Sequence, residues 1–377
     1  MAKSIYLDYA SSARINEANP GAIHELGLKE KQKLEKARKT VAGILGAHAD
    51  EIIFTSGATE SNNLAILGAP RGHIITTNIE HASVLEACRH RGHATFVEVE
   101  QSGIVDPKKI KKALRPDTVL VSVMYANNEI GTIQPIREIA KEIRHYNKLK
   151  RPDLKNSPRS GLGGRVIFHT DATQAMNYLP INVEKLGVDL MSFNAAKIYG
   201  PKGVGVLYKR RKVKLSPIMC GGNQEFGLRP GTENVAGAQA LAKALVEAEK
   251  IKNKEVKRLT KLRDYFIRCL IRANSTIEIN GDLTNRLPNN INITTPNIPS
   301  DLLVIELSAR GIMASAKSAC KAGDGKASHV IKAINPGLKE EDGSVRFSLG
   351  RGTTKKDMDD TLKALTRILT KLKKWYY

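Results

Sequence analysis

Apolar and polar positions follow two alternating patterns along most of the chain. Between residues 20 and 250, short apolar runs are separated by stretches whose apolar residues recur at helical spacing. This alternation is typical of strands and helices that build a parallel sheet covered by helices, so we expect an α/β fold. The predicted strands cover residues 51–55, 73–77, 94–100, 118–126, 165–172, 189–195 and 203–209.

Helical patterns fill the intervals, and a different arrangement follows them. Residues 59–69 and 135–149 are predicted helices, and a long helix from about 234 to 272 leads into a second region. That region contains apolar segments at 289–295, 302–312 and 345–351 and ends in an amphipathic helix. The apolar stripe of this last helix, which we assign to a core, is Met358, Leu362, Leu365, Ile368, Leu369 and Leu372.

Composition narrows the class of protein. The chain has 377 residues, of which 41% are hydrophobic, enough for a large core and more than one domain. Its apolar runs fall short of the roughly 18 residues of a membrane span, and the first residues lack the apolar region of a signal peptide. Four scattered cysteines form neither a disulfide framework nor a zinc pattern. We therefore expect a cytoplasmic protein with no membrane contact and no metal.

The charge balance is unusually basic. Sixty Lys and Arg against thirty-eight Asp and Glu give a net charge of +22, which favours acidic partners, nucleic acid included. Residues 28–39 and 249–263 have the pattern of solvated helix faces. Residues 141–165 differ, because they combine eight Lys or Arg with Pro, Ser and Gly. We interpret this segment either as a basic loop that attracts an acidic partner or as a merely solvated loop.

Two strand ends carry candidate binding chemistry. In "FTSGATESNN", residues 54–63, a strand runs into a glycine-containing turn and a helix start, which favours either an anion site or an ordinary capped helix. Asp171 ends an apolar strand, where an isolated carboxylate is costly. It needs a cationic partner, such as a protonated pyridine nitrogen, unless it caps a helix.

Lys197 is the third candidate. It follows a strand and precedes a Gly-Pro turn in "SFNAAKIYGPKG". A partly desolvated lysine has a lowered pKa and can form a Schiff base, although a lone lysine on a turn is usually a surface residue. The anion turn, Asp171 and Lys197 all fall at strand ends, where open α/β sheets build their sites. Together they are the three anchors that pyridoxal 5'-phosphate needs.

The sequence resembles the cysteine desulfurases, class V aminotransferase-fold enzymes that supply sulfur for iron–sulfur clusters and tRNA thiolation. The resemblance runs nearly end to end. It rests on "YLDYASSARI", "FTSGATESNN", "EHASV", "NNEIGTIQPI", "HTDATQ", "KIYGPKGVG", "GGNQEFGLRPGTENV", "SACKAG" and "RFSLGRGTT". It implies a pyridoxal-phosphate-dependent transferase fold whose large domain, residues 16–258, contains a mainly parallel seven-stranded sheet. A smaller α+β domain would comprise residues 1–15 and 259–377.

The resemblance also implies roles for individual residues. Lys197 would form the Schiff base, and His81 would stack on the cofactor ring and move protons. Arg351 would bind the substrate carboxylate, whereas Arg346, on an alternating strand, is equally a structural residue. The remaining cofactor contacts implied are Ala58 and Thr59 to the phosphate, Asn127 and Gln174 to the ring oxygen, Asp171 to the ring nitrogen, and Asn194 near the phosphate. Asn127 would also contact substrate.

Cys320 is the implied nucleophile. It lies in a stretch rich in Gly, Ala, Ser and Lys, and its lysine neighbours Lys317 and Lys321 favour the reactive thiolate. By resemblance it attacks the sulfur of L-cysteine, becomes a persulfide, and passes that sulfur to an acceptor protein. Thr232 matches a residue that crosses a homodimer interface to the partner's cofactor phosphate. Cys88, Cys220 and Cys269 are interpreted as structural.

One departure from the family pattern bears on cofactor binding. The family usually has Ser-x-His-Lys at the Schiff-base lysine, and this chain has Asn194, Ala195 and Ala196 before Lys197. Ala196 cannot donate to the phosphate, and a lost hydrogen bond to a charged group costs roughly 1.5–3 kcal/mol. The leading interpretation is a cysteine desulfurase, which is a sulfurtransferase. Two alternatives remain open. One is a selenocysteine lyase or related lyase, and the other is a weakly active, basic RNA-binding scaffold. Independently of these alternatives, the basic surface is a candidate contact for tRNA.

Overall fold

The computed structural model describes residues 7–12, 17–149, 165–316, 328–338 and 342–376. It confirms the predicted α/β class, with a mainly parallel seven-stranded sheet in the order β1-β7-β6-β5-β4-β2-β3. Strand β7 runs antiparallel to both of its neighbours, and the other pairings in the sheet are parallel. The strands are β1 (Ile52–Thr55), β2 (His73–Thr77), β3 (Ala94–Val97), β4 (Thr118–Ser122), β5 (Ile167–Asp171), β6 (Leu190–Asn194) and β7 (Gly205–Lys209).

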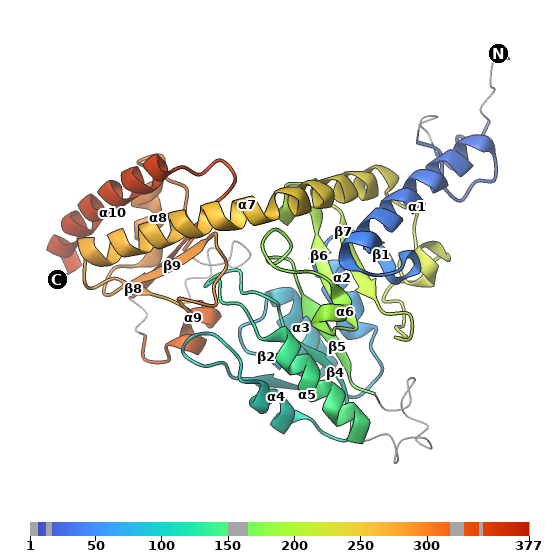
Figure 1. The fold of residues 1–377 in the computed structure, drawn as a ribbon, viewed down its shortest axis with the longest axis horizontal. Helices are drawn as coiled ribbons and strands as arrows, with labels where there is room; N and C mark the ends of the chain where they lie inside the picture. The colour runs from blue at the N-terminus through green and yellow to red at the C-terminus, as the bar shows by residue number, and fades with distance from the viewer. Residues whose placement is uncertain (1–6, 13–16, 150–164, 317–327, 339–341, 377) are drawn as a thin grey trace.

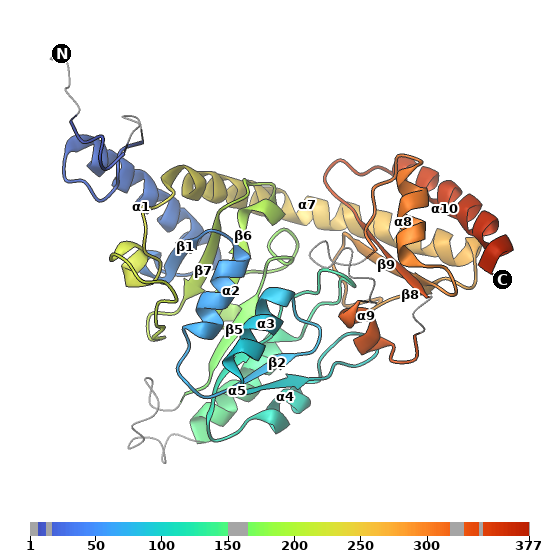
Figure 2. The ribbon, with the colours of Figure 1, turned by 180° about the vertical axis from the view of Figure 1, so that it is seen from behind.

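Helices cover both faces of this sheet, as Figures 1 and 2 show from opposite sides. Because side chains alternate along a strand, neighbouring residues such as Leu190 and Met191 enter different cores. One core packs against α2 (Ala58–Leu67) and α3 (Ala82–Arg91). The other face is covered by α1 (Glu25–Leu45), α4 (Pro107–Ala113), α5 (Ile136–Leu149), α6 (Val183–Leu186) and the first part of α7 (Val235–Ala273).

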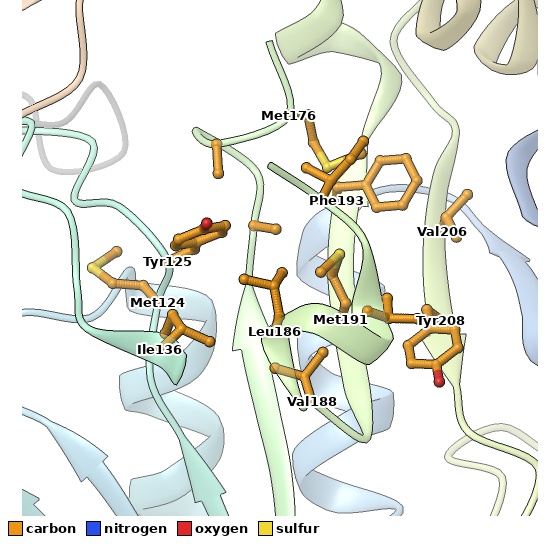
Figure 3. Packing of buried hydrophobic residues seen from close by; sticks show 14 of the residues in the cluster. Met124, Tyr125, Ile136, Met176, Leu186, Val188, Met191, Phe193, Val206 and Tyr208 are labelled. Carbon is orange, nitrogen blue, oxygen red and sulfur yellow. The ribbon is translucent and has the colours of Figure 1, made fainter. Parts of the chain in front are cut away.

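The larger of the two cores lies beneath the α7 side of the sheet. Met176, Met191, Phe193 and Val206 gather there in Figure 3, and all four are fully buried. Burying one such side chain contributes about 1.5–3 kcal/mol. Strand β6 is therefore held rigidly just before the lysine that follows it.

The predicted long helix is present as α7, which crosses from the large sheet to a second, smaller layer (Figure 1). Its last third packs Phe266 and Leu270 onto a three-stranded antiparallel sheet in the order β10-β9-β8. The remaining elements of this part are β8 (Glu278–Ile279), β9 (Asn290–Thr295), α8 (Ser300–Ser308), β10 (Gly343–Ser348) and α10 (Lys355–Tyr376).

The final helix carries the predicted stripe. Met358, Leu365, Ile368, Leu369 and Leu372 are buried in the second core, and Leu362 packs against it. The 302–312 segment is mostly the helix α8, with Leu303 and Leu307 buried.

Two segments lie apart from the small domain to which the sequence assigned them. Asp8 Oδ2 lies within hydrogen-bond distance of His24 Nε2, at 3.1 Å, beside the start of α1 and at the opposite end of the molecule from α10 (Figure 1). Helix α9 (His329–Ile334) inserts Val330 and Ile331 into the core of the large domain. Within the described residues, the chain therefore returns to the large domain after α8.

Candidate active site

The site lies where several strands of the large sheet end. Strands β5 and β6 are parallel, and β1 runs in the same direction because β7 is antiparallel to both β1 and β6. The carboxyl ends of β1, β2, β5 and β6 therefore meet at one edge of the sheet. The segments that follow them, which contain Gly57, His81 and Lys197, come together although they are far apart in sequence.

A cavity of about 530 Å³ opens at this edge. It brings together seven of the residues predicted from sequence, and the wall opposite the sheet comes from the small domain and the 126–128 segment. The predicted residues that line it are Ala58, Thr59, His81, Asp171, Gln174, Asn194 and Lys197.

Asp171 is the buried acid of the cavity. It is the last residue of β5, and alternation places it on the α2 side of the sheet, where Asn62 donates to its Oδ2 at 2.7 Å. The backbone N–H of Thr173 donates to Oδ1 at 2.9 Å. Among the described residues no cation pairs with this carboxylate, which is only 6% exposed. Since a buried carboxylate needs a positive partner, Asp171 can take a cationic ring nitrogen.

His169 supports Asp171 from below on the same face of β5. Its Nδ1 lies 2.8 Å from Ser122 Oγ and its Nε2 2.9 Å from Ser192 Oγ, so the ring bridges the two neighbouring strands. Burial lowers the pKa of His169 to about 4, so the ring is neutral at ordinary pH. It fixes the three strands without supplying a charge to Asp171.

The turn before α2 has the form of an anion site. Gly57 is the N-cap of this ten-residue helix and has no side chain to cap it, so first-turn N–H groups are left for another acceptor. Gly205 of β7 lies against this turn, and a Cβ there would stand 2.6 Å from the Gly57 backbone. The glycine at 205 therefore allows the turn to approach the cavity.

Lys197 lies in the short 3-10 helix η3 (Ala195–Ile198), which directly continues β6. Asn194 caps this turn by accepting from the Lys197 N–H at 3.1 Å, and Asn177 donates to the Lys197 carbonyl at 2.6 Å. Ala195 is fully buried, whereas Ala196 and Lys197 are exposed to the cavity. The backbone is thus fixed while the amine remains accessible.

His81 is held by its own helix. As the N-cap of α3 its Nδ1 accepts from the Ser83 N–H at 3.1 Å, so in the neutral ring the proton resides on Nε2. Beneath it, Glu80 is buried and accepts from Thr77 and from the Met124 N–H. Burial, reinforced by Asp171, raises the pKa of Glu80 to about 8, so its carboxyl is largely protonated near neutral pH.

Asn128 lines the cavity, whereas its predicted neighbour Asn127 does not. Asn127 is fully buried, and its amide is engaged by the Ile79 carbonyl and by the N–H groups of Glu129 and Ile130. Asn128 faces the cavity instead. In a pair of adjacent asparagines only one can point into a given site, and the sequence motif does not say which.

Arg346 and Arg351 also differ from the prediction, because Arg346 lines the cavity and Arg351 does not. Arg351 is absent from the cavity lining and stacks its guanidinium on Tyr199, 3.9 Å from the ring centroid. Arg346, on β10, lines the cavity and donates from Nη1 to the Asn128 carbonyl at 3.0 Å. Its buried Nε has no hydrogen-bond partner within the described part of the chain. Burial lowers the pKa of Arg346, as expected for a cation whose charge is incompletely compensated.

Among the remaining predicted residues that the structure describes, Thr232 does not line the cavity. Thr232 is exposed on the segment before α7. Cys320 falls outside the described residues, as do Lys150, Arg151, Lys155 and Arg159 of the basic 141–165 segment. At the end of that segment, Arg165 forms an ion pair with Asp189 at 2.8 Å.

The other cysteines differ in exposure. Cys88 is buried, and burial raises the pKa of its thiol to about 12, so it remains a thiol at ordinary pH. Cys220 is exposed and Cys269 is partly so.

Sequence reasoning missed several cavity residues that come from distant segments, among them Ser83, Asn177, Tyr178 and Tyr199. For Arg346 a signal existed, because Val345 and Phe347 on either side of it are buried in the second core and alternation turns Arg346 the other way.

Comparison with known proteins adds an independent line of evidence. The aminotransferase class-V family model matches residues 5–154 and 162–361. The cysteine desulfurase IscS of Dictyoglomus turgidum is 43% identical over 397 residues, with 99% of this chain and 96% of the relative covered. That of Methanosarcina thermophila is 40% identical, covering 98% and 93%.

Solved structures agree with these sequence matches. A NifS-like protein superposes with a TM-score of 0.83 at 35% identity, with 96% of this chain and 93% of that chain covered. A structure described as SspA in complex with cysteine has a TM-score of 0.72 at 32% identity, covering 88% and 90%. In the described residues, no helix is long and apolar enough to cross a membrane.

Proposed function

The chain belongs to the cysteine desulfurases of the aminotransferase class-V family, and from that premise we propose that it converts L-cysteine to L-alanine and a persulfide on Cys320. The observation that carries this proposal is the cavity itself. It joins an accessible lysine, a buried carboxylate that has no ion-pair partner in the described chain, and a helix start without a side-chain cap to an arginine from the small domain. These groups match an amino-acid substrate held against pyridoxal phosphate.

The residues present fit this cofactor. Lys197 would hold it covalently through Nζ, Asp171 would pair with the ring nitrogen, and the first turn of α2 would bind the phosphate. Thr173 also lines the cavity, and its buried hydroxyl has no hydrogen-bond partner within the described residues. This hydroxyl is available to the cofactor as well. When bound, pyridoxal phosphate supplies an electron sink next to the substrate's α-carbon.

The chain's own residues orient the substrate and move protons. The Arg346 guanidinium would take the substrate carboxylate in a bidentate arrangement, with Asn128 beside it. His81 carries a proton on Nε2 in its neutral form and would donate or accept at that atom. The Lys197 amine would be the second group able to hold or move a proton at the α-carbon.

The described ends of the Cys320 segment support its role. Ser315 pairs with Arg346 through backbone hydrogen bonds of 3.2 and 2.8 Å, and Ser344 Oγ donates to the Ala316 carbonyl. At the other end, Ser328 Oγ donates to the buried Glu129 Oε2 at 2.5 Å. One end is therefore joined to a cavity residue of the small domain, and the other to the neighbour of Asn128 in the large domain.

The sulfur transfer needs no outside oxidant. The Cys320 thiolate forms a bond to the substrate sulfur while the substrate's Cβ–S bond breaks. The bonding electron pair stays on carbon, which takes up a proton and becomes the methyl group of alanine. The sulfur remains on Cys320 as a persulfide, from which an acceptor protein would remove it. We assign the destination to iron–sulfur assembly or tRNA thiolation, in the cytoplasm.

A homodimer is part of the proposal. Thr232 is exposed, and on the same connection Met219 is 41% and Phe226 is 56% exposed. Large apolar side chains exposed on the connection that carries Thr232 support a subunit contact that would bring this threonine to the partner's cofactor phosphate. Light scattering should give the mass of a dimer, and an active monomer at micromolar concentration would contradict it.

Two variants test the chemistry. Lys197→Ala should abolish the visible absorbance of bound cofactor together with turnover, while circular dichroism stays that of the parent. Cys320→Ser should keep the cofactor and the spectral response to L-cysteine but form no protein persulfide, as measured by thiol labelling and mass spectrometry. Cys220→Ser is the matched control, since this thiol is exposed but is not proposed as nucleophile. Persulfide formation at the parent rate in Cys320→Ser would exclude Cys320.

A further inference from the structure

A second cleft lies at the amino ends of the strands, on the opposite edge of the sheet from the active site. It has a volume of about 560 Å³ and is placed between the ends of α2 and α3 and the starts of β2 and β3. Its lining includes Arg71, His90, Arg91 and His93, with Leu67 and Ile218 as apolar surface. The five residues of β2 separate the two edges, a distance of roughly 17 Å.

Arg91 is fixed in this cleft by neutral acceptors. Its Nη1 donates to the carbonyls of Leu67 and Ala69 at 3.2 and 2.9 Å, and its Nη2 to that of Pro70 at 2.5 Å. The Leu67 carbonyl is in the last turn of α2, where carbonyls lack intrahelical partners. The guanidinium is therefore oriented and half-buried, and its charge is not neutralised by these contacts.

The cleft holds more positive charge than its helices require. Arg91 lies in the last turn of α3, where a cation offsets the helix dipole, but Arg71 lies outside any helix. Burial, and then repulsion from Arg71, lower the pKa of Arg91. Among the described residues neither arginine is in an ion pair, and the carboxylate of Asp117 is 3.6 Å from His93. Two neighbouring guanidinium groups thus remain uncompensated.

We propose that this cleft binds the phosphate of a nucleotide, either free or within an RNA chain. Guanidinium groups match phosphate oxygens in a bidentate manner, and Arg91 is already oriented. The volume is in the range of small-molecule sites, and Leu67 and Ile218 offer a surface for a flat base. The inference does not depend on the desulfurase reaction, because its residues are at the other edge of the sheet.

The test compares two single-charge variants of the cofactor-loaded, full-length protein. Arg71→Ala removes a cleft arginine, whereas Arg367→Ala removes an exposed arginine from α10 of the small domain. The probes are a fluorescent ATP analogue, inorganic pyrophosphate as competitor, bulk tRNA and poly-glutamate. Arg71→Ala should weaken phosphate-ligand binding about ten-fold or more relative to Arg367→Ala. For tRNA it should also lower the salt slope by about one.

The four probes distinguish between the possible ligands. An Arg71-dependent loss for ATP, with pyrophosphate competing, identifies a free nucleotide, and an Arg71-dependent loss for tRNA alone identifies a nucleotide within RNA. Arg71→Lys should recover only part of the affinity, because it restores charge without the fork. Equal binding by the two alanine variants to every phosphate probe would overturn the proposal. So would Arg71-dependent binding confined to poly-glutamate.

Discussion

Arg346, rather than Arg351, should determine the affinity for L-cysteine, and replacing each separately tests this. Arg346 lines the cavity, keeps a buried Nε without a partner in the described chain, and is fixed by the Asn128 carbonyl at 3.0 Å. Arg351 is not part of the lining and stacks on Tyr199, which is. The variants Arg346→Ala and Arg351→Ala remove the same charge from positions five residues apart in the chain.

The expected effects differ in size. Removing a charge-assisted hydrogen bond to the substrate carboxylate costs about 1.5–3 kcal/mol, which is roughly a 10- to 150-fold loss in kcat/KM. Most of it should appear in KM, because the carboxylate is bound similarly throughout the reaction. Loss of the Arg351–Tyr199 stacking costs about 0.5–1 kcal/mol, no more than roughly five-fold. Arg346→Lys should fall between, because it keeps the charge and loses the bidentate fork.

The assay is alanine formation over a range of L-cysteine concentrations, with bound cofactor measured by absorbance for each variant. Cysteamine, which is L-cysteine without its carboxylate, provides a second measurement. The parent should bind L-cysteine more tightly than cysteamine, and Arg346→Ala should lose most of that preference at unchanged cofactor content. A larger KM increase and loss of preference in Arg351→Ala than in Arg346→Ala would refute the assignment.

Three further predictions concern stability and cofactor affinity. Burial raises the pKa of Glu80 to about 8 in the folded protein, against 4.5 in the unfolded chain, so the contribution of its protonated carboxyl to stability is complete below pH 4.5 and is lost as the pH rises through 8. The free energy of unfolding of Glu80→Gln, measured in urea, should therefore increase relative to that of the parent from pH 5 to pH 8.5. An equal difference between the two proteins at both pH values would contradict this. Glu225→Ala should lower the free energy of unfolding by about 3–5 kcal/mol, because it leaves the buried Arg38 guanidinium without its buried partner. Glu35→Ala, which removes the more exposed partner of Arg38, should lower it by less than about 1 kcal/mol. Similar losses in the two variants would exclude an uncompensated buried charge as the cause. Ala196→His should tighten cofactor binding in a spectroscopic titration by placing a donor at the cavity, and unchanged affinity would mean that another group already fills the gap.

The sequence by itself determined the layered fold and most of the residues that line the cavity on the side of the large sheet. Strand and helix periods are local properties, and most appear in the structure near the predicted bounds, as with β2 at 73–77 and α7 at 235–273. Strands β3 and β4 end earlier than predicted, at Val97 and Ser122 rather than at residues 100 and 126. Asp171, Lys197 and the turn before α2 were identified because strand ends in a parallel sheet converge. That convergence follows from topology and does not require knowledge of side-chain packing.

Tertiary structure decided which neighbouring residue faces the cavity. Asn127 is consumed by the backbone of its own turn, which leaves Asn128 for the site, and no local pattern distinguishes the two. The exchange of Arg351 for Arg346 depends on where β10 of the small domain lies against the large sheet, and α7 and the second core set that position. The physical reason is range: periodicity reports on contacts a few residues apart, whereas the substrate wall is made by segments more than 200 residues apart that meet only when the two cores pack.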